Sequence, residues 1–317
     1  MKSINELTDE FLNSVDRADS TIKHYRKVLG YWKRSTDFYQ KTIEDITGSD
    51  LVQWIHKLEE EKRAPATIDN YLATVRAFYK YLESKGVVNI TKNIQRKTGK
   101  NRNYTRQSLT PEQLFQLLAS LKDETLQDLR NGAMTKLMAL TGLRCIEVSR
   151  TNNGDLKFAG DNWYLQLQRK GERDKGSRIL LPDVVREAIQ KYQERKGSAD
   201  EYDSSLFVNA GPYKPGGRIS PRFLSRVIKK QLIGIGLNNR SYCAHSLRHT
   251  AACLASTAGS EIEEISAMLG HKSIWQTLTY LRSLGLRSGV EDRAINKITQ
   301  YWKEYNKNAS KNNKHKP

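Results

Sequence analysis

Hydrophobic residues in the first 86 positions recur every three to four residues, in four separate stripes. The stripes begin at Leu7, Ile22, Leu51 and Ile68. This spacing places the apolar side chains of each segment on one face of an α-helix, and that face must be buried against other helices. We therefore predict an all-α four-helix bundle over residues 1–90, with its aromatic side chains in the core in preference to a base-stacking surface.

Beyond residue 108 the pattern is mixed. The segments 163–168 and 178–182 alternate apolar and polar residues, which predicts two β-strands with one buried face, joined by a basic turn. Helical spacing predicts helices at about 111–121, 124–140, 183–195, 220–233, 245–257, 261–269, 274–282 and 291–305. The second region is thus expected to be an α+β domain, mainly helical, with a small antiparallel sheet.

Residues 91–108 separate the two regions and contain six Lys or Arg residues and no acidic residue. Such a segment is typical of an exposed linker. Thr110, Pro111 and Gln113 follow at once, in the pattern of an N-cap, a first-turn proline and a capping box. The predicted organisation is a helical domain at 1–90, a basic linker at 91–108, a second domain at 109–305 and a disordered basic tail at 306–317.

The charge of the chain indicates the kind of partner. A net charge of +18 and a pI near 9.7, with both regions basic, favour a polyanion such as nucleic acid. Six basic residues that lie off the apolar stripes or in the linker are candidate phosphate contacts: Lys23, Lys27, Arg76, Lys80, Arg102 and Arg106. A solvated polar face would show the same pattern, so that alternative stays open.

A membrane surface is the competing partner for a basic protein. No segment has the strongly amphipathic basic helix, with Trp or Phe on its apolar face, that surface binding favours. No apolar run approaches the ~18 residues that cross a bilayer, and the first residues lack the order of a secretion signal. The three cysteines form no CxxC pair, which argues against a disulfide framework or a zinc site. We expect a cytoplasmic protein.

The first patch with chemical potential is Arg144 and Glu147, which follow a mostly apolar helix that breaks at Gly142. An arginine carried on an apolar frame is expected to be partly buried, and a buried guanidinium needs an anion. Glu147 is the nearest candidate if both residues lie on one helical face. Taken alone, the patch is better explained by a structural Arg–Glu pair than by a catalytic site.

The second patch is His245, Arg248 and His249. On a helix the first two are i and i+3 neighbours, so an imidazole and a guanidinium face the same space. A metal site on the two histidines is disfavoured, because the motif lacks the glutamate of HExxH and Arg248 would repel a cation. An oxyanion held by Arg248 beside an acid/base histidine suits phosphoryl chemistry better.

The third patch contains His271 and Tyr280, nine residues apart. Gly270 is expected to end one helix, and Ser273 with Gln276 to open the next through a capping box. On a continuous helix His271 and Tyr280 would lie on opposite faces, so the break at Gly270 is what lets them meet. A single tyrosine is more often a core residue than a nucleophile, so Tyr280 depends on its neighbours for support.

These motifs together resemble those of the tyrosine recombinase family, which includes phage and transposon integrases and the Xer recombinases. The chain has TGLRxxE, a Lys-Gly turn between two strands, HxLRH, LGH and a tyrosine nine residues after that histidine, in the family's order. Arg248 and His271 are 23 residues apart, as the family pattern requires. The resemblance covers about residues 109–285, and the N-terminal bundle is similar to the family's SAM-like core-binding domain.

The resemblance implies roles for the residues that bind and attack the scissile phosphate. Arg144 and Arg248 would hold its non-bridging oxygens and stabilise the pentacoordinate transition state. Tyr280 would attack phosphorus, leaving a 3′-phosphotyrosyl link and a free 5′-hydroxyl. His271 would donate a hydrogen bond to the phosphate. No metal, ATP or other cofactor is expected, since the covalent link conserves the energy of the cleaved bond.

The same resemblance assigns proton transfer and orientation. Lys170, in the basic turn between the predicted strands, would be the general acid for the departing 5′ oxygen, with Arg173 and Lys175 as rivals in the same turn. His245 would assist proton transfer, and Glu147 would orient the His/Arg cluster without touching the phosphate. The polar stretch after Glu147 predicts that the helix following Arg144 ends early.

The family pattern also implies double-stranded DNA with a specific site as partner and a homotetramer for strand exchange. Docking of a C-terminal helix on a neighbouring protomer would use the apolar face Ala294, Ile295, Ile298, Tyr301 and Trp302. Packing of that helix within its own chain is an equal alternative. Two other functions stay open: relaxation of DNA by a type IB topoisomerase, and DNA-binding regulation without catalysis.

Overall fold

The computed structural model describes residues 3–35, 42–95, 106–197, 202–210, 215–271 and 273–283. The chain forms two compact units that divide between Arg102 and Asn103, inside the predicted linker. Each unit is considered by itself. The predicted tail, the apolar face at 294–302 and Arg102 lie outside the described residues.

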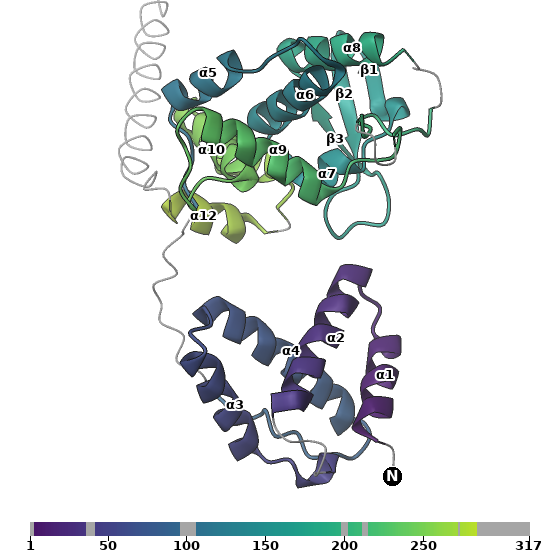
Figure 1. Ribbon diagram of the computed structural model, residues 1–317, viewed down its shortest axis with the longest axis vertical. Helices are drawn as coiled ribbons and strands as arrows, with labels where there is room; N and C mark the ends of the chain where they lie inside the picture. Colours follow the sequence, from purple (N-terminus) through teal and green to yellow (C-terminus); the bar gives the residue numbers. More distant parts are fainter. Residues whose placement is uncertain are drawn as a thin grey trace, which may run out of the picture. The chain divides into compact units, whose positions relative to one another are not determined.

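The first unit is helical throughout its described part (Figure 1). Its elements are α1 (Ile4–Ser14), α2 (Asp19–Ser35), the 3₁₀ turn η1 (Ile43–Asp45), α3 (Gly48–Glu60) and α4 (Pro65–Glu83). Trp32, Trp54 and Tyr79 are at most 2% exposed, and the ring of Trp32 lies 6.1 Å from that of Trp54 and 5.5 Å from that of Tyr79. The four-helix bundle and its aromatic core are confirmed.

Most described residues of the predicted linker are exposed (Lys92, Asn93, Gln95, Arg106 and Gln107), but contacts hold the chain at both of its ends. Thr91 is buried, and Arg76 donates a hydrogen bond of 2.6 Å to the carbonyl of Ile94, so this end is part of the first unit. At the other end, the amide of Gln107 donates to the carbonyl of Ser241, and that of Leu109 to the hydroxyl of Thr250 at 2.8 Å. Backbone groups at both ends are satisfied by contacts that composition does not reveal.

The second unit contains eight helices and a three-stranded antiparallel sheet among its described residues. The helices are α5 (Pro111–Ala119), α6 (Leu126–Thr141), α7 (Cys145–Ser149), α8 (Asp183–Lys196), α9 (Pro221–Gly234), α10 (Ala244–Thr257), α11 (Ile262–Leu269) and α12 (Ile274–Ser283). The strands, in sheet order, are β1 (Leu156–Ala159), β2 (Asn162–Leu167) and β3 (Ser177–Leu180). The predicted α+β class and the capping box that opens α5 are confirmed.

The sheet contains one strand more than the sequence predicts. In β2, Leu165 and Leu167 are buried as the alternation requires, and Leu165 pairs with Leu156 of β1 and Ile179 of β3. The strand β1 is only four residues long, and its last two are exposed. A segment this short has no detectable alternation, so its strand structure comes from pairing with β2.

The central helix α6 positions the chemistry-bearing segments. It packs against α8 and α10, and it ends at Gly142 in the left-handed conformation (φ 68°). A Cβ at Gly142 would lie 2.9 Å from Leu269 Cδ2 and 3.4 Å from Ala251 Cβ, so glycine is needed both for the turn and for this close approach. The end of α6 is thereby brought against α10 and the end of α11. Among the described residues, no helix combines the length and apolar character needed to cross a membrane.

Candidate active site

The site is built around the C-terminus of α11. This helix ends at Gly270, which has a φ of +59°, and the last carbonyl groups of any helix lack partners within the helix itself. Three arginines from other segments donate to these carbonyls. Arg169 donates to Ala267 and Met268, while Arg144 and Arg248 both donate to Leu269. Positive charge is stabilised here by the negative end of the helix dipole.

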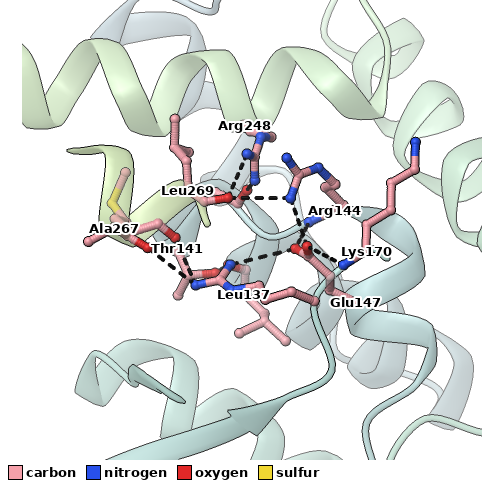
Figure 2. A network of polar contacts seen from close by, with 11 residues as sticks. Leu137, Thr141, Arg144, Glu147, Lys170, Arg248, Ala267 and Leu269 are labelled. Carbon is pink, nitrogen blue, oxygen red and sulfur yellow. Dashed lines mark hydrogen bonds and ion pairs between the residues drawn. The ribbon is translucent and has the colours of Figure 1, made fainter. Parts of the chain in front are cut away.

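Arg144 and Arg248 meet at one carbonyl oxygen, as Figure 2 shows. Arg248 is 2% exposed and donates 2.7 Å to the Leu269 carbonyl and 2.8 Å to the Gly142 carbonyl. Arg144 donates 3.3 Å to the same Leu269 oxygen, with 24% of its side chain exposed. Two guanidiniums at one neutral acceptor form a positive centre that is open to solvent on the Arg144 side, which is an arrangement suited to an oxyanion.

Glu147 is the buried carboxylate of the site and has no solvent exposure. It accepts from the amide of Arg144 at 2.9 Å and from its guanidinium at 2.8 Å. Glu147 is the partner of Arg144, as predicted, but the shared helical face on which that prediction was conditional is absent. Arg144 is instead the N-cap of α7 and Glu147 its third residue, so their contact is a capping interaction. The predicted early end is confirmed, because α7 is five residues long.

The three histidines of the motifs are close to this positive centre. His245 lies in the first turn of α10, and its ring is 4.7 Å from the ring of His249, which is fully buried. His271 follows the end of α11, and its Nδ1 is 2.8 Å from the hydroxyl of Thr277 in α12. The break at Gly270 therefore returns the chain so that His271 contacts α12.

Desolvation and the surrounding cations lower the pKa of His245 and His271, so both imidazoles are neutral near pH 7. Desolvation lowers the pKa of His245 to about 4, assisted by the charges of Arg248, Arg144, Arg106 and Lys170. His245 is nevertheless exposed, so its lowered pKa comes from the protein atoms and cations on one side of the ring and not from complete burial. Desolvation likewise lowers the pKa of His271 to about 4, again with Arg248 and Arg144 contributing. A neutral imidazole can accept a proton and donate a hydrogen bond, which are the two abilities phosphoryl transfer needs.

The basic turn after β2 carries three candidate proton donors, and their surroundings differ. Lys175 is held by Asp155, with 2.6 Å between its Nζ and the carboxylate. Arg173 is exposed, and its carbonyl accepts from the amide side chain of Gln168. Lys170 is exposed, its charge acts on His245, and its side chain points away from Glu147 (Figure 2). Its backbone amide lies 3.4 Å from the Glu147 carboxylate.

Tyr280 lies in α12, but its side chain is outside the described part of the structure. Position 280 follows Thr277 by three residues, so the two positions share a face of the helix. Because His271 contacts Thr277, the backbone geometry brings His271 to the face of α12 that includes position 280.

The candidate phosphate contacts have mixed outcomes. Lys23 and Lys27 are exposed on α2, as are Arg76 and Lys80 on α4, although Arg76 also donates to the Ile94 carbonyl. Arg106 is exposed and donates to the carbonyl of Arg240, where its charge acts on His245 and His249. Within the described ranges, no three His, Cys, Asp or Glu side chains gather as they would to hold a metal ion.

One residue of the site was missed at the sequence level. Arg169 is 5% exposed and contacts both α11 and Glu147, yet it stands in a turn with several other basic residues. No local signal separates it from its neighbours, because its burial depends on Gly270, about a hundred positions later in the chain. The absence of a Cβ at Gly270 is the only hint the sequence contains.

Because its buried histidine is held neutral, we expect the protein to lose free energy of unfolding in acid. Desolvation lowers the pKa of buried His249 to about 3, against ~6.5 in an unfolded chain. Below that unfolded value the unfolded state binds the extra proton, so stability is complete above about pH 6.5 and falls as the pH drops towards 3, by about 1.4 kcal/mol per pH unit for one histidine. Thermal unfolding at several pH values measures this slope. His249→Gln should flatten it, whereas His56→Gln, at an exposed position of α3, should not; an equal slope in all three proteins would contradict the assignment.

Comparison with known proteins gives the family. Residues 107–285 match the model of the phage integrase family, and residues 4–86 match that of the phage integrase N-terminal SAM-like domain. The tyrosine recombinase XerC of Corynebacterium efficiens is 25% identical over 88% of this chain and 86% of its own length. The tyrosine recombinase XerD of Listeria monocytogenes is 26% identical over 90% of this chain and 96% of its own length.

Solved structures agree with the fold. The XerH site-specific recombinase, bound to its difH substrate after cleavage, superimposes with a TM-score of 0.69 at 18% identity, over 86% of this chain and 80% of that one. The integrase of the transposon Tn1549, in complex with a circular intermediate DNA, gives a TM-score of 0.68 at 17% identity, over 88% and 95%. The family match over more than half of the chain settles the predicted resemblance: this protein belongs to the phage integrase family of tyrosine recombinases, enzymes that cleave and rejoin DNA strands.

Proposed function

We propose that this chain is a site-specific recombinase that acts on double-stranded DNA through a covalent bond between Tyr280 and the 3′ end of the cleaved strand. The observation that carries the proposal is the meeting of Arg144 and Arg248 at the Leu269 carbonyl, with neutral His245 and His271 beside them. A scissile phosphate that replaced the Leu269 carbonyl as the acceptor of both guanidiniums would gain two charged hydrogen-bond donors.

In the proposed step, the Tyr280 oxygen attacks phosphorus and its proton passes to His245. The bond from phosphorus to the 5′ oxygen breaks, and Lys170 gives that oxygen its proton. Arg144 and Arg248 stabilise the extra negative charge on the non-bridging oxygens, and His271 donates a hydrogen bond to one of them. A 5′-hydroxyl from a second strand reverses the step, so neither ATP nor a metal ion is required.

The proposed role of Lys170 as the acid rests on its surroundings. Lys175 is bound to a buried carboxylate, Asp155, and would have to break this ion pair to reach a phosphate. Lys170 is exposed and its charge acts on His245, the proposed proton acceptor. A lysine at an exposed position of a turn can also engage a phosphate only when DNA is present.

We further propose that four protomers exchange strands through a Holliday junction at two copies of a specific site. The relatives named as tyrosine recombinases XerC and XerD match this chain over 86% and 96% of their own length, and the solved transposon integrase is in complex with a circular intermediate DNA. Integration, excision and resolution of dimers use the same chemistry and differ in the DNA supplied. Relaxation of DNA by a single protomer, as a type IB topoisomerase performs it, is the competing function.

Covalent trapping tests the proposal. The probe is a duplex recovered from a random-sequence pool by binding to the protein, nicked close to the cleavage position so that the short 5′-hydroxyl fragment diffuses away. We expect a protein–DNA complex that survives denaturation and carries the label of the 3′-linked strand. Absence of such a complex would refute the proposal. Relaxation of a supercoiled plasmid that lacks the recovered sequence, at a rate equal to site cleavage, would favour the topoisomerase.

A further inference from the structure

Arg169 is a buried arginine next to the proposed acid Lys170, and the mechanism above does not use it. It is 5% exposed, and its guanidinium donates to the carbonyls of Ala267 and Met268, not to the Leu269 oxygen at which Arg144 and Arg248 meet. Its side chain runs beneath Gly270, where an added Cβ would lie 2.7 Å from its Nε and 2.9 Å from its Cζ. The glycine that ends α11 and precedes His271 thus leaves room for this guanidinium and for nothing larger than hydrogen.

The contacts of Arg169 join three separate parts of the site. Its Nη2 donates 3.1 Å to the Met268 carbonyl and lies 3.5 Å from that of Ala267, at the end of α11. Its Nη1 is 3.8 Å from the carboxylate of Glu147. The next backbone amide, that of Lys170, lies 3.4 Å from the other oxygen of the same carboxylate. The base of the turn is therefore held at two adjacent points.

Stability alone does not account for a guanidinium at this position. Among the described residues, its Nε and Nη1 have no hydrogen-bond partner, and burial lowers the pKa of Arg169 despite the charge of Glu147. Desolvating a charge that is only partly compensated costs free energy, and an apolar side chain of the same size often stabilises such a site better. What the arginine does provide is a fixed geometry between the turn, Glu147 and α11.

We propose that Arg169 is a positioning residue for the general acid: it fixes the base of the turn so that Lys170 meets the 5′ oxygen of a phosphate held by Arg144 and Arg248. The inference rests on the proposed function, in which Lys170 protonates that oxygen. It adds that the acid's placement depends on α11, the helix whose end also binds both phosphate-holding arginines. The three guanidiniums then fix the positions of Lys170, the phosphate and His271 relative to one another.

The test uses two versions of the nicked duplex, one ordinary and one with sulfur in place of the scissile 5′ oxygen. A thiol with a pKa of ~8.5 leaves without a proton, whereas an alkoxide needs the general acid. We expect Arg169→Met to slow single-turnover cleavage of the ordinary duplex by about 100-fold, with the sulfur duplex cleaved within about fivefold of the wild-type rate. Lys170→Ala should show the same rescue, and the double variant should be little slower than either single one.

Controls separate positioning from damage to the fold. Arg130→Met removes another buried arginine of the same unit, 2% exposed and bound to the Val208 carbonyl, and should show no rescue by sulfur. Arg169→Lys keeps the charge but loses the planar set of N–H donors of the guanidinium. We expect a partial loss of cleavage rate on the ordinary duplex, which the sulfur duplex also rescues. If Lys170→Ala is rescued and Arg169→Met is not, the inference is overturned while the proposed function stands. If wild-type protein forms no covalent complex, the proposed function itself has failed.

Discussion

Tyr280→Phe should abolish the covalent protein–DNA complex while DNA binding is preserved. Phenylalanine lacks the oxygen that would bond to phosphorus, so complex formation is expected to fall by at least about 10⁴-fold, to the limit of detection. Affinity for DNA depends mainly on many Lys and Arg contacts to phosphates, so the dissociation constant should change by less than about threefold. Denaturing gels measure the first quantity, and gel shift at fixed salt measures the second.

Tyr242→Phe is the matched control for this result. Tyr242 precedes α10 in the same unit and packs against the core, so its loss of a hydroxyl tests for general effects of the substitution. Cleavage by this control should equal that of the wild-type protein. A covalent complex that persists in Tyr280→Phe would show that another residue is the nucleophile.

The helix ends at Gly142 and Gly270 are the part of the site that could be predicted from the sequence. Gly142 and Gly270 end their helices, as predicted, and the structure shows both in the left-handed conformation. The break at Gly270 is predicted to let His271 and Tyr280 meet; His271 contacts Thr277 of the following helix, and the meeting with Tyr280 stays a prediction. Such features depend on a few neighbouring residues, which the sequence displays directly.

Features that depend on distant residues could not be predicted. The partner of Arg169 is the end of α11, about a hundred positions away, and its burial requires the small size of Gly270. Strand β1 exists because β2 pairs with it, and the chain at the end of the linker, Gln107 to Leu109, is held by Ser241 and Thr250. In each case the free energy that stabilises the local conformation comes from tertiary contacts, which the propensities of the neighbouring residues do not predict.

The Arg144–Glu147 contact lies between these cases. The sequence predicted the partner correctly, but it assumed a shared helical face where the structure has a capping interaction. The correction changes what the glutamate does. By accepting from the backbone amide as well as the guanidinium, Glu147 fixes the start of α7 and the direction of Arg144 together. A structural Arg–Glu pair and a poised catalytic arginine are therefore not exclusive alternatives.

Arg144→Ala and Arg248→Ala should each slow cleavage by about 10³-fold or more, while DNA binding weakens by less than about threefold. Arginines that stabilise charge in phosphoryl-transfer transition states contribute factors of this size, whereas one phosphate contact among many contributes little to affinity. Arg248→Ala also leaves the carbonyls of Gly142 and Leu269 without these donors, which costs about 1–3 kcal/mol for each buried acceptor. Thermal unfolding must therefore accompany the kinetics.

Arg144 is 24% exposed, but its guanidinium is bound to the fully buried Glu147 carboxylate, so thermal unfolding must accompany this variant too. Arg186→Ala is its matched control: that side chain is 31% exposed and pairs with Asp183 three residues away, on α8. The control should cleave at the wild-type rate. Arg144→Lys keeps the charge but cannot present two parallel donors, so it should recover only a small part of the loss. If binding and cleavage fall by the same factor in Arg144→Ala, the arginine holds DNA equally in the ground and transition states, and its proposed role in stabilising the transition state is wrong.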